Sequence, residues 1–305
     1  MSDGPLVTIV TPSYNQAAYL EEAIVSVLEQ DHAPIEYAIV DGGSTDGSVD
    51  VIRRYEDRLA WWTTGADDGQ AAALTTAFAR ARGEYLGWLN ADDTLLPSSV
   101  ATVATALDAD PDALFAYGDA VYTDDASRRT GYFVSADLDA VQMARTCTDH
   151  INPQGALFRR DALGLGLPLQ GFYCWDFELV LRLGAVGHAV KIERPVATFR
   201  LHDESKSVGS SPIVRAEDYL AMYDRFFATP DLPPELRAVE NEAQAACRIW
   251  AGQLFYAGGD HARARRCFAE ALRLHPAARA PRTLSYLART LLPPRAARRL
   301  RAARR

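Results

Sequence analysis

Short apolar runs alternate with amphipathic segments over the first hundred residues of the chain. Four runs have the length and composition of buried strands, at residues 6–11, 35–40, 59–63 and 85–89. Three segments between them carry apolar residues at helical spacing, at residues 16–29, 49–55 and 71–81. This alternation predicts an α/β fold with three layers, in which helices cover both faces of a mostly parallel central sheet.

The pattern continues, with less regular spacing, to about residue 202. Residues 122–133, with Asp124 and Asp125 at their centre, are expected to form a hairpin or a long loop. The remaining predicted elements are strands at 113–118, 151–160, 188–193 and 196–202 and a helix at 175–183.

Beyond a Ser/Gly/Pro-rich stretch at residues 205–212, only helical patterns follow. Residues 243–257 and 262–274 are separated by Gly258-Gly259-Asp260, which predicts a helical hairpin. The residues that resemble a single tetratricopeptide repeat are Gly252, Tyr256, Gly259, Asp260, Ala264, Phe268, Ala271, Leu272 and Pro276. Because a lone repeat cannot bury both of its faces, we expect these helices to pack against the rest of the chain or a second subunit, as in a homo-oligomer.

A chain of 305 residues, 48% hydrophobic and 24% charged, suits one large domain with an extension. We therefore expect an α/β domain at 1–210 and a helical extension at 211–305. The spacings of the four cysteines match neither a disulfide framework nor a paired Cys-x-x-Cys zinc site. The sequence has no signal-peptide pattern and no apolar stretch of the ~18 residues that a membrane span needs, so we expect a cytoplasmic protein.

The net charge of -8 is unevenly distributed, because the segment 281–305 contains arginines and no acidic residue. Two interpretations stay open for this tail. It is a solvated chain end, or it contacts an anionic membrane surface as a peripheral anchor. The arginines of segment 281–305 are Arg282, Arg289, Arg295, Arg298, Arg299, Arg301, Arg304 and Arg305. No nucleic-acid partner is expected for the chain.

Polar loops follow three of the predicted strands. They are residues 11–15, 41–47 and 90–93. Because strand-to-helix loops of a parallel sheet lie along one edge, and ligands bind outside the carboxyl ends of the strands, these loops predict a shared site.

Asp92 and Asp93 could hold Mg2+ or Mn2+ together with phosphate oxygens. The competing interpretation is that they cap the helix expected to begin near Pro97. The loop 41–47 offers glycines for close backbone approach and polar groups for a base or ribose, although it lacks the spacing of a dinucleotide-binding loop. Asp46 is also expected to serve as a helix N-cap, and Tyr14 either stacks on a base or packs against its neighbours.

Seven blocks in this order resemble glycosyltransferase family 2, which covers residues 6–207. They are VTIVTPSYN at 7–15, VDGGSTDG at 40–47, GEYLGWLNADD at 83–93, LLP at 95–97, QGALFRR at 154–160, WDFELVLRL at 175–183 and RLHDESKS at 200–207.

The resemblance implies a GT-A fold, a nucleoside diphosphate sugar donor (by default a UDP-sugar) and inversion at the anomeric carbon. It further implies a nucleotide-sugar-binding part at 1–118 and an acceptor-side part at 119–210. Asp176 matches the general base of the family, and the metal ligands for Mn2+ or Mg2+ would be Asp93, Asp92 and His202. The donor-binding residues would be Thr11, Pro12, Tyr14, Asn15, Asp41, Gly43, Ser44, Asp67, Gln70, Asn90 and Asp92.

Both key assignments also have plain structural alternatives. Asp176 heads a helix whose N–H groups stabilise a carboxylate, and His202 lies at a strand end. Judged alone, Asp176 would be a helix cap and His202 a surface histidine.

The chain departs from the family pattern at four positions. Asn90 stands where the metal motif has its first acid, and Trp175 precedes the base where many members have Glu. Thr75 replaces a frequent Asn, and Asp68 stands where a basic residue is common. Trp175, with Phe172 and Tyr173, either stacks on the acceptor or belongs to the core.

The activity expected from the resemblance is sugar transfer in surface glycan or polysaccharide synthesis, with a glycan or a lipid-linked molecule as acceptor. A non-catalytic nucleotide-sugar-binding scaffold is the first alternative. A sugar nucleotidyltransferase is the second, although the chain has no Gly-rich loop with a nearby basic residue for a triphosphate.

Overall fold

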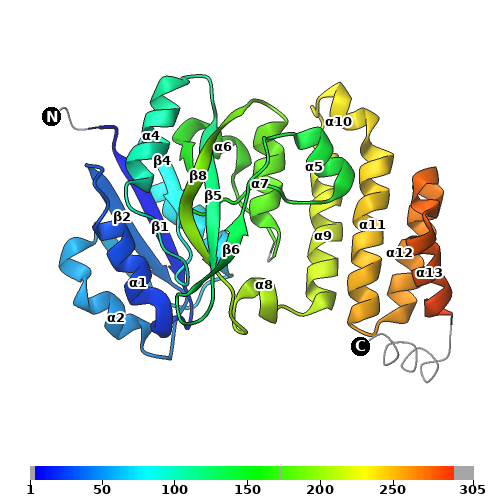
Figure 1. Ribbon diagram of the computed structural model, residues 1–305, viewed down its shortest axis with the longest axis horizontal. Coiled ribbons are helices and arrows are strands. Elements are labelled where there is room, and N and C mark those ends of the chain that lie inside the picture. Colours follow the sequence, from blue (N-terminus) through cyan, green and yellow to red (C-terminus); the bar gives the residue numbers. More distant parts are fainter. Residues whose placement is uncertain (1–3, 172, 292–305) are drawn as a thin grey trace. The chain divides into compact units, whose positions relative to one another are not determined.

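The computed structural model describes residues 4–171 and 173–291 (Figure 1). The chain divides into two compact units. The sheet unit comprises the chain up to residue 138 and residues 149–208, and the helical unit comprises residues 139–148 and the chain from residue 209 onward. These units differ from the predicted division at residue 210, because the short segment 139–148 belongs with the C-terminal helices.

The sheet unit contains an eight-stranded sheet with the order β3-β2-β1-β4-β7-β5-β6, in which β8 also pairs with β5. The strands are β1 (Val7–Ser13), β2 (Ile35–Asp41), β3 (Trp61–Thr64), β4 (Tyr85–Trp88), β5 (Phe115–Thr123), β6 (Arg129–Phe133), β7 (Leu157–Arg159) and β8 (Ala189–Arg200). The helices are α1 (Ala17–Leu28), α2 (Ser48–Arg54), α3 (Gln70–Arg80), α4 (Ser99–Ala109), α6 (Arg160–Gly166), α7 (Trp175–Gly184) and α8 (Lys206–Gly209), with a 3-10 turn at Glu56–Arg58.

Parallel pairing brings the carboxyl ends of the first four strands to one edge. β1 runs parallel to both β2 and β4, and β3 runs parallel to β2. Ser13 is opposite Asp41 at the end of the β1–β2 ladder. β7 is antiparallel to β4 and β5, whereas β8 is parallel to β5. The prediction of an α/β fold with a mostly parallel sheet is confirmed.

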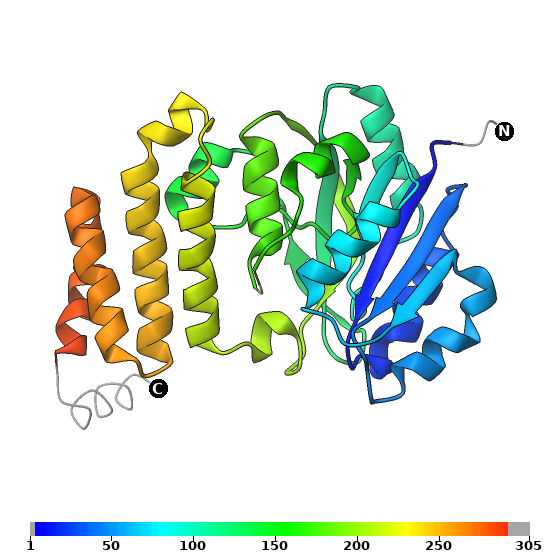
Figure 2. The same ribbon diagram turned by 180° about the vertical axis from the view of Figure 1, so that it is seen from behind.

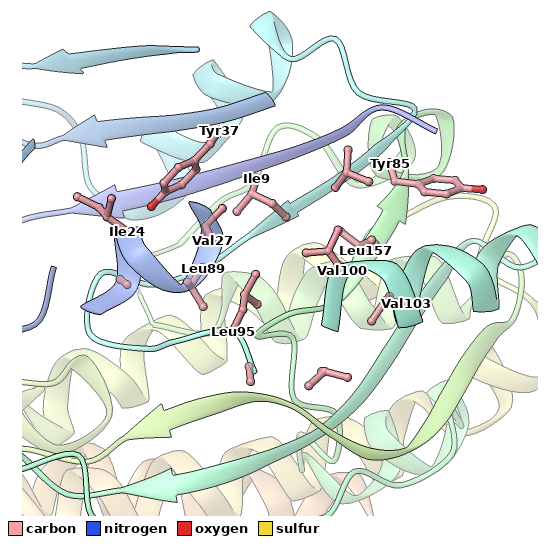
Figure 3. Close-up of a cluster of buried hydrophobic side chains, with 14 of the residues drawn as sticks. Ile9, Ile24, Val27, Tyr37, Tyr85, Leu89, Leu95, Val100, Val103 and Leu157 are labelled. Carbon is pink, nitrogen blue, oxygen red and sulfur yellow. The ribbon is translucent and has the colours of Figure 1, made fainter. Parts of the chain in front are cut away.

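Apolar side chains from the sheet and its helices form the core on each face. On one face, Ile9 and Tyr37 of the sheet meet Ile24 and Val27 of α1 and Val103 of α4 (Figure 3). On the other face, aromatic rings from α3, β4, β5, β7 and α7 lie in contact, and Trp88 stacks on Phe158 at a centroid distance of 5.3 Å. Burial of aromatic surface of this extent fixes the helices to the sheet.

Three predicted strands differ from the structure. Only Leu157–Arg159 of the predicted strand 151–160 pairs with its neighbours, because the chain turns at Gly155, whose φ of +75° is in the left-handed region. Residues 188–193 and 196–202 form the single strand β8, because a register shift against β5 accommodates Pro195, which lacks an N–H. The hairpin at 122–133 is confirmed by the antiparallel pair β5–β6.

In the helical unit, α11 packs against both α9 and α12, and α13 follows α12. The helices are α5 (Ala140–Thr146), α9 (Pro212–Phe227), α10 (Pro234–Ala238), α11 (Glu240–Ala257), α12 (His261–Leu274) and α13 (Pro281–Thr290), with a 3-10 turn at Pro276–Arg279 (Figure 2). The predicted helical hairpin is confirmed as α11 and α12. Gly252 permits their close approach, since a Cβ there would lie 2.7 Å from the Phe268 ring.

Arg282 and Arg289 of the arginine-rich tail lie in α13, whose Tyr286 and Leu287 pack into the core of the helical unit. The prediction for the other six arginines concerns residues outside the described part of the chain. All four cysteines are buried and free. Among the described residues, no helix is long and apolar enough to cross a membrane.

Candidate active site

The Asp41 carboxylate organises the loop that follows β2. Its Oδ1 accepts hydrogen bonds from the backbone N–H groups of Gly43 and Ser44, at 3.1 and 2.9 Å, and from Thr64 Oγ1 at 2.7 Å. Its Oδ2 accepts from Ser44 Oγ. Four donors match the acceptor capacity of a carboxylate, so Asp41 fixes the shape of this loop. Its contact with a nucleotide stays a prediction.

Asn15 and Asp46 connect the loops after β1 and β2. The backbone N–H of Asn15 donates to Ser44 Oγ at 2.8 Å, and Asn15 Oδ1 accepts from the Thr45 N–H at 2.9 Å. Asp46 accepts from Ala17 N and Ser48 N, the first residues of α1 and α2. Although burial alone would raise the pKa of Asp46, these bonds and one from the Ser48 hydroxyl lower it. Asp46 therefore binds the first N–H group of both helices, but the expected N-cap position of α2 is occupied by Gly47.

Tyr14, Gly42 and Asp67 lie together at this end of the site. A Cβ at Gly42 would lie 3.3 Å from both carboxylate oxygens of Asp67 and 3.4 Å from the Tyr14 ring. Tyr14 is 63% exposed, which leaves a face of its ring open to a planar ligand. A residue larger than glycine at position 42 would crowd both neighbours.

The side chains of Thr11 and Pro12 are buried, and the donor-binding role of these two residues stays a prediction. Thr11 is 0% exposed, and its hydroxyl is hydrogen-bonded to Tyr37 Oη at 2.9 Å within the sheet. Pro12 is also buried, opposite Val40 in the β1–β2 ladder. Both residues belong to the buried end of β1, a strand that is covered on both of its faces.

Asp93 is anchored at the end of β4 and does not cap a helix. Its Oδ1 accepts from the backbone N–H of Arg200 at 2.7 Å, and its Oδ2 accepts from Asn90 Nδ2 at 3.3 Å. Helix α4 begins at Ser99, and its N-cap, Ser98, makes no side-chain capping bond. The capping interpretation of the acidic pair is therefore wrong.

Asp92 pairs with His202. The distance from His202 Nε2 to Asp92 Oδ2 is 3.1 Å, and the Tyr19 ring lies against the imidazole at a centroid distance of 4.7 Å. Burial and the neighbouring charge of Asp92 raise the pKa of Asp93 well above its usual range. Asp92 and His202 therefore lie together after β4 and β8, while the role of Asp92, Asp93 and His202 as metal ligands stays a prediction.

Arg200 holds the loop at residues 90–93, called the acidic loop here because it contains Asp92 and Asp93. This role of Arg200 was not predicted from the sequence. Its side chain is only 1% exposed, and its Nε donates to the Asp92 carbonyl oxygen at 2.7 Å. Its other nitrogens donate to Asp124 O, Ser127 Oγ and Glu22 Oε2. An arginine at the end of a largely apolar strand was the available signal, because a buried charge requires partners.

A second network joins the acidic loop to α7. Gln70 Nε2 donates to Asn90 Oδ1 at 2.6 Å, while Gln70 Oε1 accepts from Trp175 Nε1 at 3.2 Å and from Lys206 Nζ at 2.9 Å. Trp175 is 2% exposed and lies beside Trp88, so it belongs to the core. Asn90 therefore links Gln70 to Asp93. A carboxylate at position 90 would instead repel the Asp93 carboxylate.

Asp176 lies in the first turn of α7, where its Oδ1 accepts from the Phe177 N–H at 3.0 Å. Asp149 is close enough for the two charges to interact. Burial, together with the charge of Asp176, raises the pKa of Asp149 to about 8. Asp176 thus has a neighbour that holds a proton at neutral pH. No local pattern predicted this pairing, because the two residues are distant in the chain.

The other departures from the family pattern are structural. Thr75 Oγ1 accepts from the Leu169 N–H at 3.0 Å and so replaces an amide in holding that loop. Asp68 is exposed beside Asp67.

The residues present fit a divalent cation only together with a ligand. Among the described residues, no group of three or more His, Cys, Asp or Glu side chains forms a metal site by itself. Carboxylate and imidazole are suitable ligands for Mn2+, and a cation beside Asp92 and Asp93 would offset their mutual repulsion. Asp92, Asp93 and His202 therefore supply part of a coordination shell that phosphate oxygens would complete.

Comparison with known proteins gives a family and a fold. The family model described as glycosyl transferase family 2 matches residues 8–164, slightly more than half of the chain. TuaG of Bacillus subtilis, a putative teichuronic acid biosynthesis glycosyltransferase, is 41% identical over 92 residues, which cover 29% of this chain and 36% of TuaG. The match therefore spans little more than a third of that relative.

Two solved structures are similar over most of the chain. S. aureus TarS (residues 1–349, in complex with UDP-GlcNAc) has a TM-score of 0.63 at 12% identity and covers 89% of this chain and 90% of its own. The mannosyltransferase PcManGT from Pyrobaculum calidifontis, in complex with GDP-Man and Mn2+, has a TM-score of 0.60 at 21% identity, with 94% and 79% covered. At these identities the likeness concerns the fold, and it confirms the predicted GT-A architecture.

Proposed function

Because the chain belongs to glycosyl transferase family 2, we propose that it transfers a sugar from a nucleoside diphosphate sugar to an acceptor hydroxyl, with inversion at the anomeric carbon. One observation carries the proposal. Gln70 is hydrogen-bonded both to Asn90 of the acidic loop and to Trp175, the neighbour of Asp176. A donor bound at the acidic loop would therefore lie within reach of a carboxylate on α7.

Asp176 acts as the general base in this proposal. It removes the proton from the acceptor hydroxyl, whose oxygen attacks the anomeric carbon as the bond to the nucleoside diphosphate breaks. The proton on neighbouring Asp149 limits repulsion between the two carboxyl groups, which leaves Asp176 to accept the acceptor's proton.

The donor's base and ribose would bind between the exposed ring of Tyr14 and the loop that Asp41 organises. Asn15, Gly43, Ser44 and Asp67 would contribute polar atoms around the base and ribose. A UDP-sugar is the proposed donor, in line with the UDP-GlcNAc bound to TarS. The GDP-Man bound to PcManGT makes a GDP-sugar the alternative to test.

A divalent cation would be held by Asp92, Asp93 and His202. When bound, it supplies positive charge to the leaving phosphate. Arg200 keeps the acidic loop in place for this purpose, because its backbone and side chain together bind Asp93 and Asp92. The Mn2+ in the PcManGT structure supports this part of the proposal.

The acceptor that we propose is a glycan or a lipid-linked precursor in polysaccharide synthesis, in line with the role in TuaG's name. The arginine-rich tail would then contact an anionic membrane surface. Truncation to test this should begin after Leu291, since Tyr286 and Leu287 pack in the helical unit. Unchanged binding of the truncated chain to anionic liposomes would reject the contact.

A thermal-shift screen tests the donor proposal directly. UDP, GDP, dTDP and their common sugar conjugates would be added with and without Mn2+, because a ligand that binds the folded chain raises its melting temperature. We expect stabilisation by one class of nucleoside diphosphate, enhanced by Mn2+. A chain that none of these compounds stabilises would contradict the proposed function.

A further inference from the structure

Lys206 places an ammonium group inside the candidate active site. Its Nζ donates to Gln70 Oε1 at 2.9 Å and lies 5.5 Å from the centroid of Trp175 and 5.9 Å from that of Tyr173. These distances suit cation–π contacts, which help to hold the half-buried side chain in place. Gln70 takes one of the three N–H donors that an ammonium group carries.

Lys206 differs in its environment from Arg200, the other cationic side chain that reaches the acidic loop. Arg200 is buried, and its side-chain nitrogens donate to the Asp92 carbonyl and to Asp124, Ser127 and Glu22. It has no exposed surface to offer a ligand. Within the described residues, by contrast, no carboxylate is paired with the Lys206 ammonium.

The electrostatics of the site call for such a cation. Asp92 and Asp93 lie in the loop where the diphosphate is proposed to bind, and carboxylates repel phosphate oxygens. A lysine ammonium is a compact point charge with rotatable donors, which suits a phosphate group of unfixed orientation.

Gln70 also connects Lys206 to both sides of the proposed site. Gln70 links the ammonium to Asn90 on the donor side, and Trp175 beneath it precedes the base Asp176. Between a donor loop and a general base lies the anomeric carbon, and the leaving phosphate is attached to it.

We infer that Lys206 is a donor-binding residue that contacts the diphosphate of the sugar nucleotide, so that the chain itself neutralises part of the charge on the leaving group. The inference rests on the proposed function. It requires that the ligand contain a diphosphate. Lys206 would then neutralise part of the diphosphate charge that a cation at Asp92 would otherwise neutralise alone.

The chain provides a matched internal control, because Lys206 and Lys191 are its only two lysines. Lys191 lies in β8 and pairs with Glu193 at 3.4 Å. Calorimetry would compare the wild type, Lys206→Gln, Lys206→Arg and Lys191→Gln for binding of UDP, GDP and the matching nucleosides. Acetylation by a lysine-reactive ester, followed by mass spectrometry, would compare the two lysines with and without the nucleoside diphosphate.

We expect Lys206→Gln to bind the nucleoside diphosphate roughly 10- to 100-fold more weakly, with nucleoside binding changed less than about two-fold. Lys206→Arg should recover most of the affinity, and Lys191→Gln should behave as the wild type. The diphosphate should slow acetylation of Lys206 and leave that of Lys191 unchanged. Retained nucleoside binding also shows that the variant is folded.

Equal affinity of Lys206→Gln and wild type for the diphosphate would overturn the inference, as would acetylation of Lys206 at the same rate with and without ligand. A parallel loss of nucleoside and diphosphate binding would also overturn it, since Lys206 would then act only through Gln70. A wild-type chain that binds no nucleoside diphosphate would instead reject the proposed function, and the inference with it.

Discussion

The backbone N–H of Arg200 donates a 2.7 Å hydrogen bond to Oδ1 of Asp93, although 107 residues separate the two in the sequence. The Arg200 guanidinium binds the carbonyl of Asp92 in the same loop. One residue at the end of β8 thus fixes both members of the acidic pair at the end of β4.

Replacement of Arg200 should therefore destabilise the fold as well as the site. We expect Arg200→Gln to lower the free energy of unfolding by about 3 to 5 kcal/mol, because it leaves buried acceptors without their charged donor. Urea denaturation measures the change. Arg54→Gln is the control: Arg54 and its partner Glu21 are 56% and 49% exposed, and such a pair contributes less than about 1 kcal/mol. Similar losses in the two variants would contradict the assigned role.

Asp176→Asn should retain donor binding and lose sugar transfer by a factor of about 100 to 10,000, because the amide cannot accept the acceptor's proton. Calorimetry with the nucleoside diphosphate and a product assay separate the two effects. Asp50→Asn, on the exposed side of α2, is the control and should transfer normally. Normal turnover by Asp176→Asn would show that another group is the base.

His202→Asn should weaken binding of Mn2+ by about ten-fold or more, measured in the presence of the nucleoside diphosphate. The imidazole lies 3.1 Å from Asp92 and orients that carboxylate even where it is not itself a ligand. His188→Asn offers a comparison, since His188 is paired with Asp110 at an exposed position. Chelation of Mn2+ by EDTA should reduce transfer, and unchanged Mn2+ affinity in His202→Asn would exclude the histidine from the site.

Asp149 makes stability depend on pH. Because burial and the charge of Asp176 raise the pKa of Asp149 to about 8, the folded chain keeps a proton between about pH 4 and pH 8 that the unfolded chain has lost. This residue therefore lowers the free energy of unfolding as pH rises through that window, by at most about 1.4 kcal/mol per pH unit. Asp149→Asn should remove this pH dependence. In urea denaturation, the free energy of unfolding of the variant should therefore rise relative to that of the wild type from pH 5 to pH 8. An unchanged difference between the two chains across this range would refute the assignment.

Gly252→Ala should destabilise the helical unit by about 1 to 3 kcal/mol, although alanine favours helix, because the new Cβ would lie 2.7 Å from the Phe268 ring. The double variant with Phe268→Leu should lose less than the sum of the single changes. Gly164→Ala in α6 is the control, since a Cβ there meets no atom within 4 Å, and it should be neutral or stabilising. Thermal denaturation of the wild type, Gly252→Ala, Phe268→Leu, the double variant and Gly164→Ala checks the prediction.

The sequence predicted the parallel strands and their polar loops because each strand ended in a local change from apolar to polar residues. It could not predict that Thr11 points into the sheet, since a strand buried on both faces shows no alternation that would separate its inner from its outer side chains. The pairing of Asp149 with Asp176 and the bonds of Arg200 arise from chain segments that meet only after folding. Local pattern thus located the site, whereas its electrostatics required the tertiary structure.

The segment 139–148 lies in the middle of the sheet unit's sequence but packs with the C-terminal helices. Tyr223 of α9 donates a 2.8 Å hydrogen bond to the carbonyl of Ala144 in α5, and Arg145 pairs with Glu242 of α11. During synthesis from the amino terminus, α5 leaves the ribosome well before these partners exist. We therefore expect that α5 can pack only after the chain has been made as far as α11, and that fragments ending near residue 210 need chaperones to shield the apolar face of α5.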